Sequence, residues 1–489
     1  MKSINDKALD FNTLEQETYD FVCMMGRKLI EEFFKHVDNE LMKNRDKEAY
    51  RHKGLKRTTI KTIMGSVELK RAIYETINDD GKKVFIYLLD EYLNFETIGK
   101  MSSNLVEKMI ENITLCSYRK AAKNVTELTG QSISHGAAWN LAQTVGKRIE
   151  NQDNEKVNKF KSGHLDGDKE VNIIFEEADG LWLSIQGKDR PKNGKGKKKE
   201  IKLAVSYEGW ERRSGKKEAY LVKNKKVVSG FMKPEEFKYL RDASLAETYK
   251  MDEIELRILN GDGATWIRNG HDNEGDYFQL DKFHISQAIV RNIKEKEEVT
   301  RLIKIVQNGN VDELFKRLTE LKYECGGEYE IVKKIETLES YLSANKDGIV
   351  PYQMRVNVPC APDGLYYRNL GTMEHNIFDV LGYRMKGQKM SWSIKGAHYL
   401  SKILATKASG NLYETISSLM SCTLPGRAIE RFNEVIKNTT EKITNAKKRL
   451  KLYPVHEASI PFGQCVNTPG RKALRNIFND KLATELIYR

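Results

Sequence analysis

The sequence predicts a mixed α/β (α+β) protein with several folding units. Its 489 residues exceed what one ordinary core accommodates, and a 39% hydrophobic composition with only 9 prolines is typical of globular, helix-rich chains. Strand-like patterns concentrate between residues 171 and 281, whereas helix-period patterns dominate 13–45 and 285–345. The two patterns are separated along the chain, so distinct helical and sheet-containing parts are expected.

The N-terminal part predicts a helix followed by a basic hairpin. Apolar residues recur at three- and four-residue steps in 13–45, which indicates the helix. Residues 66–75 and 82–90 read as strands, and the intervening TINDDG supplies the Asp-Gly chemistry of a tight turn. From 51 to 71 there are seven Lys or Arg against one acid, Glu68, which makes this the first basic cluster.

Residues 117–149 read as two helices joined by a turn at Gly130 and a serine-rich cap. This is the pattern of a helix-turn-helix, which would leave Ser134, His135, Asn140 and Gln143 available for DNA contacts. An ordinary helical hairpin gives the same pattern, so both interpretations stay open.

The segment from 171 onward predicts a sheet with a fixed order of elements. Strands are expected at 171–187, 201–210 and 219–230, then a helix at 234–250, then strands at 254–262 and 277–281. Three strands, a helix and further strands are the element order of an RNase H-like sheet. Residues 285–345 read as an inserted helical module, and helices resume at 372–386 and 393–408 before a basic tail.

The formal charge of +13 and a pI near 9.1 favour a polyanionic partner. Residues 188–200 hold seven basic and two acidic side chains, either as a DNA-backbone contact or as a solvated loop, and GKGKKK lacks the spacing of a phosphate-binding P-loop. The six cysteines are scattered without a CxxC pair, and neither a signal peptide nor a membrane span is found. A cytoplasmic protein with reduced thiols, associated with the nucleoid when bound, is the expectation.

Asp179 is the first candidate for chemistry. If 171–185 is one strand, the odd positions share an apolar face that includes Asp179, and a carboxylate there calls for a cation or a hydrogen-bond network. Alternatively, Asp179-Gly180 is a hairpin turn between two apolar runs. Periodicity does not decide between them.

Three further positions carry candidate carboxylates. Asp262 follows a strand within NGDG, where α/β sheets place ligands, although an isolated Gly-Asp-Gly is more often a turn without function. Asp281 and His284 are three residues apart, which suits a local hydrogen bond better than a metal site. Glu374 lies in the first turn of a helix that Thr372 can cap, a position that the helix dipole favours without any function.

The strings EEADGLWLSIQG, NGDGATWIRNG, FQLDKFH and GTMEHNIFDVLGYRMKGQKMSWSIKGAHYL resemble the signature blocks of ISLre-type insertion-sequence transposases. These are bacterial DDE transposases, distantly similar to the Mutator-like group and long described only as an uncharacterised family. The resemblance also covers GSVELKRAIY, LLDEYL and SYRKAA near the N-terminus. It implies an RNase H-like catalytic domain with an all-helical insertion.

By that resemblance Asp179, Asp262 and Glu374 align with the three acidic ligands, and Asp281 and His284 with a C/D-x-x-H element that we take as support for the site. The spacings are 83 residues (262 − 179) and 112 residues (374 − 262), the second enlarged by the helical module. The implied cofactor is Mg²⁺ or Mn²⁺, with two ions per active site that activate the attacking group and stabilise the leaving oxygen. No small-molecule cofactor and no membrane are expected.

The expected organisation has five parts: a DNA-binding region at 1–165, catalytic parts at 166–294 and 366–425, a helical insertion at 295–365 and a basic helical tail at 426–489. The expected partners are double-stranded DNA, at the element ends and the target, and further copies of the chain in a synaptic complex. A nuclease or resolvase without strand transfer, and a non-catalytic DNA-binding protein derived from a transposase, are the alternatives. The residues expected to contact DNA are Arg51, Lys53, Lys56, Arg57, Lys61, Arg119, Lys120, His135, Asn140, Gln143, Lys195, Lys197, Lys198, Lys199, Arg384 and Lys386.

Overall fold

The computed structural model describes residues 10–92, 100–190, 197–213, 219–268 and 274–419, together with residues 430, 433–434 and 436–438. The compact unit Met1–Thr423 contains nearly all of them. Lys195 and almost all of the expected tail 426–489 lie outside the described residues. Among the described helices, none has the length and apolar character that crossing a membrane requires.

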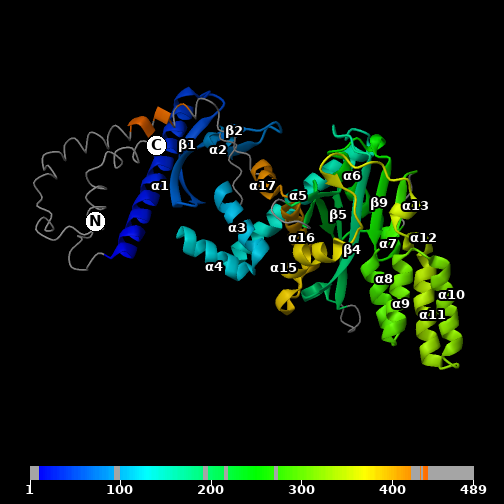
Figure 1. Ribbon diagram of the computed structural model, residues 1–489. Helices are drawn as coiled ribbons and strands as arrows, with labels where there is room; N and C mark the ends of the chain where they lie inside the picture. The colour runs from blue at the N-terminus through cyan, green and yellow to red at the C-terminus, as the bar shows by residue number, and fades with distance from the viewer. Residues whose placement is uncertain are drawn as a thin grey trace, which may run out of the picture. The chain divides into compact units, whose positions relative to one another are not determined.

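A long helix and a three-stranded antiparallel sheet form the N-terminal part (Figure 1). Helix α1 (Phe11–Asn44) packs on β2 (Gly65–Ile77), and the Asp38 carboxylate accepts a hydrogen bond from the Ala72 backbone N–H at 2.8 Å. Strand β3 (Lys83–Ile86) pairs with β2, which confirms the predicted hairpin. The strand predicted at 82–90 is too long, because α2 (Leu88–Tyr92) begins within it. The basic cluster begins with a strand that the sequence did not predict, β1 (Arg51–Thr62), because its residues lack an apolar alternation.

Three helices follow, each started by a serine. The side chains of Ser102, Ser117 and Ser134 cap α3 (Ser103–Leu115), α4 (Tyr118–Thr129) and α5 (His135–Lys161) by accepting backbone N–H bonds. Gly130 ends α4 with φ of 65°, a left-handed conformation that glycine adopts without strain. The two predicted helices and their turn at Gly130 are confirmed.

A five-stranded mixed sheet lies at the centre of the second half (Figure 1). Its strands are β4 (Ile173–Ser184), β5 (Lys198–Tyr207), β8 (Lys226–Gly230), β9 (Leu256–Gly261) and β10 (Asp276–Leu280), in the order β10-β9-β4-β5-β8. Strands β4, β5 and β8 are mutually antiparallel, whereas β9 and β10 run parallel to β4. A smaller sheet joins β11 (Leu365–Tyr366), β6 (Trp210–Arg212) and β7 (Tyr220–Val222).

Helices cover both faces of the large sheet. On one face, Ala178, Ala204 and Leu259 pack against α6 (Pro234–Ala246) and α7 (Thr265–Arg268). On the other, the odd residues of β4 pack against α16 (Ile394–Ala408) and against a helical segment from Met373 to Met385. α17 (Leu412–Leu419) follows and contacts α3 and α5. The predicted mixed α/β class is confirmed.

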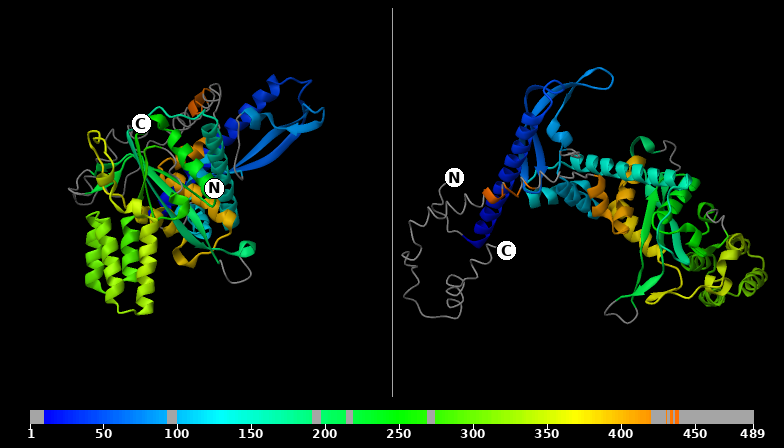
Figure 2. Two further views of the ribbon diagram at one scale, coloured as in Figure 1. Left: turned by 90° about the vertical axis from the view of Figure 1, so that its right-hand side faces the viewer. Right: turned by 90° about the horizontal axis from the view of Figure 1, so that it is seen from above.

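The predicted helical module is also present. The helices α8 (Lys282–Asn292), α9 (Lys296–Gln307), α10 (Val311–Glu324) and α11 (Tyr329–Ala344) lie side by side as a bundle (Figure 2), and the short α12 (Lys346–Ile349) and α13 (Tyr352–Arg355) lead back to the sheet. Its apolar core includes Ile285 and Ile289 of α8 and Leu280 of β10. The bundle therefore shares its core with elements that precede the expected boundary at residue 295.

Candidate active site

Asp179 lies within a continuous strand. β4 pairs with β5 from Phe175 to Ser184, and Asp179 lies opposite Leu203, so the alternative of a hairpin turn at Asp179-Gly180 is wrong. The neighbouring odd positions Phe175, Leu181 and Leu183 are buried in the main apolar core. The predicted placement of Asp179 on an apolar face is therefore confirmed.

Asp262 lies beside Asp179 because of the strand register. β4 and β9 run parallel with Ala178 opposite Gly261, so Asp179 and Asp262 are the next residues on the two neighbouring strands. Asp262 also has the local turn structure that the alternative expected: its Oδ1 accepts a hydrogen bond from the Ala264 N–H at 2.8 Å, and Gly263 has φ of 89°. From the helical bundle, the Tyr341 hydroxyl donates to the Asp262 carbonyl oxygen at 2.9 Å.

Asp179 experiences the negative charge of its neighbours. Its pKa is raised to about 6, mainly by burial; the Gly180 N–H and His284 oppose the rise, and the charges of Asp262 and Glu374 add to it. The Gly180 N–H donates to Asp179 Oδ1 at 2.6 Å. The three predicted carboxylates therefore lie close enough to interact electrostatically, with His284 as a nearby group whose charge offsets part of their repulsion.

Glu374 is in the first turn of α14 (Met373–Asn376), which continues through a π-helix at Ile377–Gly382 into α15 (Tyr383–Met385). The predicted cap by the Thr372 side chain is wrong, because that side chain makes no capping bond to the helix. The Thr372 hydroxyl donates instead to the carboxylate of Glu177.

Glu177 is the residue that the sequence alone did not single out. Its fully buried carboxylate accepts hydrogen bonds from the backbone N–H groups of Gly371, Thr372 and Met373 at 3.0 to 3.2 Å. Glu177, on β4, thus binds the start of α14, the helix that contains Glu374. Its only sequence signal is that it shares the face of β4 with Asp179, two residues away.

A polar network continues from Glu177 to the Asp281/His284 pair. Asn260 Nδ2 donates to Glu177 Oε2 at 2.9 Å and to Asp281 Oδ2 at 2.7 Å. Asp281 Oδ1 caps α8 through the N–H groups of Phe283 and His284 and lies 3.4 Å from His284 Nδ1. The Asp281 carboxylate beside the ring, together with the charge of Asp179, raises the pKa of His284 against the effect of its burial.

The arrangement limits how a metal ion could bind. Within the described residues, no group of three or more His, Cys, Asp or Glu side chains is arranged to hold a metal ion by itself. Asp179 and Asp262 nevertheless offer the carboxylate oxygens that Mg²⁺ prefers, and Mg²⁺ in proteins typically binds one or two carboxylates and fills its remaining positions with water and phosphate oxygens. Two carboxylates from the chain would therefore leave the other coordination positions of such an ion to oxygen atoms from outside the described residues.

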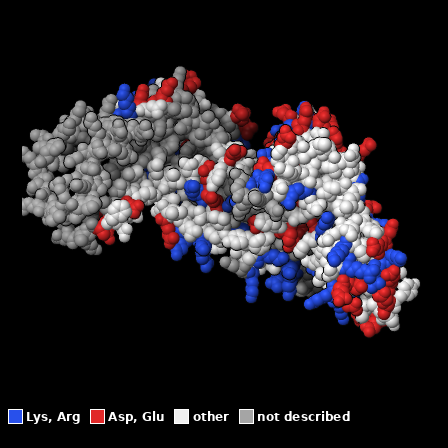
Figure 3. Space-filling model, viewed as in Figure 1, with Lys and Arg blue, Asp and Glu red and all other residues white. Residues whose placement is uncertain are grey.

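Most of the expected DNA contacts are exposed side chains. Lys53 is paired with Glu75 at 2.9 Å, and Lys61 donates to the Ser132 carbonyl oxygen at 2.6 Å, which ties β1 to the turn before α5. The exposed residues of the expected set are Arg51, Lys53, Lys56, Arg57, Arg119, Lys120, His135, Asn140, Lys197, Lys198, Lys199 and Lys386. Figure 3 shows several Lys and Arg side chains along the lower edge of this face, below α4 and α15.

Two of the expected contacts are buried and need correction. The Gln143 side chain is only 9% exposed because α5 packs that face against its neighbours, so it is not available to DNA. Arg384 is 3% exposed; its Nε donates to the Ile113 carbonyl oxygen, and its guanidinium lies near the rings of Tyr118 and Trp392. Arg384 therefore joins α15 to α3 and α4.

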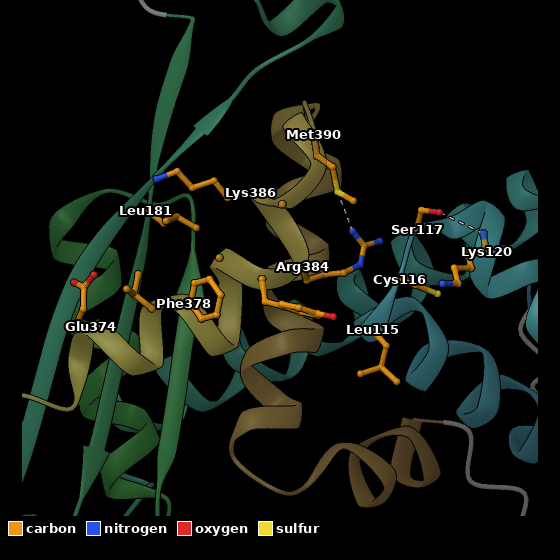
Figure 4. Close-up of a pocket in the computed structure, with 14 residues that line it drawn as sticks. Leu115, Cys116, Ser117, Lys120, Leu181, Glu374, Phe378, Arg384, Lys386 and Met390 are labelled. Atoms are coloured by element: carbon orange, nitrogen blue, oxygen red, sulfur yellow. Dashed lines mark hydrogen bonds between the residues drawn. The ribbon is translucent and has the colours of Figure 1, made fainter.

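A cavity of about 530 Å³ extends from Glu374 to the start of α4 (Figure 4). Glu374 lies at one end of the lining residues and Lys120 at the other, with Phe378 and Arg384 between them. The cavity thus connects the candidate active site to the start of α4.

The chain is similar to a group of bacterial proteins. The model of a family described as an uncharacterised protein family, UPF0236, matches residues 4–418. One UPF0236 protein of Caldanaerobacter subterraneus subsp. tengcongensis is 24% identical over 417 residues, 84% of this chain and 80% of that protein. Another from the same organism, whose name joins eleven gene designations, is 24% identical over 398 residues, 80% of this chain and 76% of that protein.

A further relative, from Streptococcus gallolyticus, is named as the UPF0236 protein in the vanSb 3′ region. It is 22% identical over 415 residues, 82% of this chain and 83% of that protein. Because the family model matches most of the sequence, the chain belongs to the uncharacterised protein family UPF0236.

Proposed function

We propose that this protein is a DDE-type transposase of a bacterial insertion sequence, which cuts DNA strands at the element ends and joins them to target DNA. The observation that carries the proposal is the β4–β9 register, by which the partly buried Asp179 lies beside Asp262. The pKa of Asp179 is raised to about 6, mainly by burial and to a smaller extent by the charges of Asp262 and Glu374. A carboxyl group whose pKa is strongly raised, at a place shared with other acids, is typical of functional sites.

Asp179 and Asp262 would hold the divalent ion, and Glu374 would complete the site from α14. When bound, Mg²⁺ or Mn²⁺ supplies activation of the attacking hydroxyl and stabilisation of the leaving oxygen. The chain itself positions these carboxylates through the β4–β9 register and through Glu177 at the start of α14. An ion shared with a DNA phosphate is consistent with the lack of a three-ligand cluster among the described residues.

The sheet supports the assignment of an RNase H-like fold. In that fold the first three strands are antiparallel, and the next two run parallel to the first, on its other side. Strands β4, β5, β8, β9 and β10 have this order and direction. Asp179 lies in the first strand of the sheet, Asp262 directly follows the fourth, and the glutamate comes from a helix on its face.

The N-terminal part supports a role in binding DNA. Exposed Lys56 and Arg57 on β1 provide positive charge for phosphates. The pair α4–α5, with Gly130 between the helices and exposed His135 and Asn140 on the second, suits a helix-turn-helix that reads a groove.

The name of one relative supports the proposal that the gene belongs to a mobile element. One relative's name joins eleven gene designations of a single organism. We interpret these designations as copies of one gene, which is the result expected when an element inserts repeatedly into a genome.

The experiment is an assay of strand cleavage and joining. The full chain is incubated with a supercoiled plasmid that carries the gene with its flanking DNA and a second plasmid as target. We expect nicks at defined positions with Mg²⁺ or Mn²⁺, products in which the element strand is joined to the target, and no reaction in EDTA. Nicking without joined products would indicate a nuclease, and DNA binding without either reaction would indicate a non-catalytic DNA-binding protein.

A further inference from the structure

The π-helix beside Glu374 exposes two aromatic rings to solvent. Phe378 is 58% exposed and Tyr383 is 63% exposed, and their ring centroids are 6.4 Å apart in an edge-to-face arrangement. They are five residues apart, and the π-helix at Ile377–Gly382 connects them. π-Helical turns are rare and recur at functional sites, and exposed apolar surface often marks a binding site. A pair of exposed rings on a π-helix therefore indicates a site for a ligand.

Both rings line the cavity of about 530 Å³ that also contains Glu374, Lys120 and Lys386. This volume lies within the range of about 300 to 1,000 Å³ that is typical of small-ligand sites. Lys120 and Lys386 are exposed, so their charges are available to an anionic ligand. The cavity therefore combines ring faces, cations and a candidate catalytic carboxylate.

This combination matches one unpaired nucleotide of a DNA strand. A ring can stack only on the face of a base, and duplex DNA hides base faces except at unpaired or terminal positions. The lysines suit the phosphates of the same strand. Glu374 lies four residues before Phe378 on the same helical segment, so a stacked base would lie close to the carboxylate.

We propose that this cavity binds an unpaired nucleotide of the DNA strand being cut or joined, with its base against Phe378 and Tyr383 and its phosphate near Lys120 and Lys386. The inference rests on the proposed function, since it names a subsite of the same active site. By this assignment the rings hold the strand end next to the three carboxylates.

The test measures binding of a fluorescent 12-nucleotide oligothymidine and of a blunt 20-base-pair duplex to the full chain, by anisotropy, without divalent ions and at several salt concentrations. The double variant Phe378→Ala/Tyr383→Ala should bind the single strand at least about tenfold more weakly. Its salt slope, the change of the logarithm of the binding constant with the logarithm of the salt concentration, should stay the same. Its affinity for the duplex should change by less than about twofold. Lys120→Ala/Lys386→Ala should instead reduce the salt slope.

Two controls separate this effect from a loss of structure. Phe378→Trp keeps a stacking surface and should keep the affinity. Tyr323→Ala removes a ring that is 83% exposed on α10, far along the chain from the cavity, and should change nothing. Thermal unfolding of each variant verifies the fold.

Single-strand binding by the double variant within about twofold of the parent would overturn the subsite, as would an equal loss of single-strand and duplex binding. A change in oligomeric state with unchanged single-strand binding would also overturn it and indicate a protein contact instead. The nicking assay tests the proposed function separately. If the parent protein nicks DNA and the double variant keeps its affinity for the single strand, only the subsite is refuted. If single-strand binding depends on the two rings but the parent protein does not nick DNA, only the proposed catalysis is refuted.

Discussion

Replacing Glu177 should separate its role in folding from its role in positioning Glu374. Glu177 Oε2 accepts four N–H donors, from Asn260, Gly371, Thr372 and Met373, whereas Oε1 accepts the hydroxyls of Tyr207 and Thr372 and shares the Thr372 N–H. In Glu177→Gln the amide oxygen can take the place of Oε2 and accept the same N–H bonds. The NH₂ group then takes the place of Oε1 and can donate to the hydroxyls of Tyr207 and Thr372, which can rotate to accept.

The cost of Glu177→Gln is then mainly the weakening from charged to neutral hydrogen bonds, about 2 kcal/mol in the free energy of unfolding. In Glu177→Ala the backbone N–H groups at the start of α14 lose their acceptor and have no other partner among the described residues. Each unsatisfied buried group costs roughly 1 to 3 kcal/mol, so we expect the free energy of unfolding to fall by about 4 kcal/mol or more. Because a misplacement of about 1 Å can reduce a rate roughly a hundredfold, even the folded Gln variant should cut DNA at least about tenfold more slowly.

Urea unfolding measures the stabilities, and nicking of the plasmid at saturating Mn²⁺ measures the rates. The matched control is Glu208→Gln, since Glu208 is also a buried carboxylate. Its partners are Lys169, Tyr249 at 2.8 Å and Asn224 at 2.7 Å, rather than the residues at the start of α14. This variant should lose stability and keep its cleavage rate. A Glu177→Gln variant that cuts at the parent rate would refute the positioning role.

Three other results are expected. In metal-free protein the pKa of Asp179 is raised from 3.8 to about 6 by burial and neighbouring acids, so the free energy of unfolding should fall as the pH rises from about 4 to about 6. Above pH 6, Asp179→Asn should therefore be more stable than the parent by on the order of 2 to 3 kcal/mol in urea unfolding. Below about pH 4 the two proteins should not differ. Glu176, fully buried beside Arg241 and Arg257, has a pKa lowered from 4.5 to about 2, so its contribution is present above pH 4.5 and lost as the pH falls toward 2; Glu176→Gln should cost about 3 to 5 kcal/mol, and an increase in stability would contradict its structural role. Lys56→Ala should weaken duplex binding uniformly across sequences and reduce the salt slope by about 1, and an unchanged slope would remove β1 from the DNA interface.

The sequence predicted elements that depend on local pattern. The alternation in β4, the Asp-Gly turn before β3 and the glycine between α4 and α5 are all encoded within a few residues of where they act. The face of Asp179 was predictable for the same reason. Whether the chain turned at Gly180 was not predictable, because the pairing with β5 decided it.

The parts that the sequence did not predict depend on distant partners. β1 has few apolar residues and is a strand because it pairs with β2. Gln143 and Arg384 look like surface residues, yet tertiary packing buries both. The donors that bind Glu177 at the start of α14 are about 195 residues further along the chain, so no local pattern reveals them.

The most direct test compares cleavage by two variants of the full chain in Mn²⁺: Asp262→Asn, which changes a proposed ligand, and Asp379→Asn, which changes an exposed acid five residues after Glu374. Both keep side-chain shape and remove one negative charge. We predict that Asp262→Asn abolishes nicking of the plasmid while Asp379→Asn cuts at the parent rate. Nicking at the parent rate by folded Asp262→Asn would contradict the assignment of the active site.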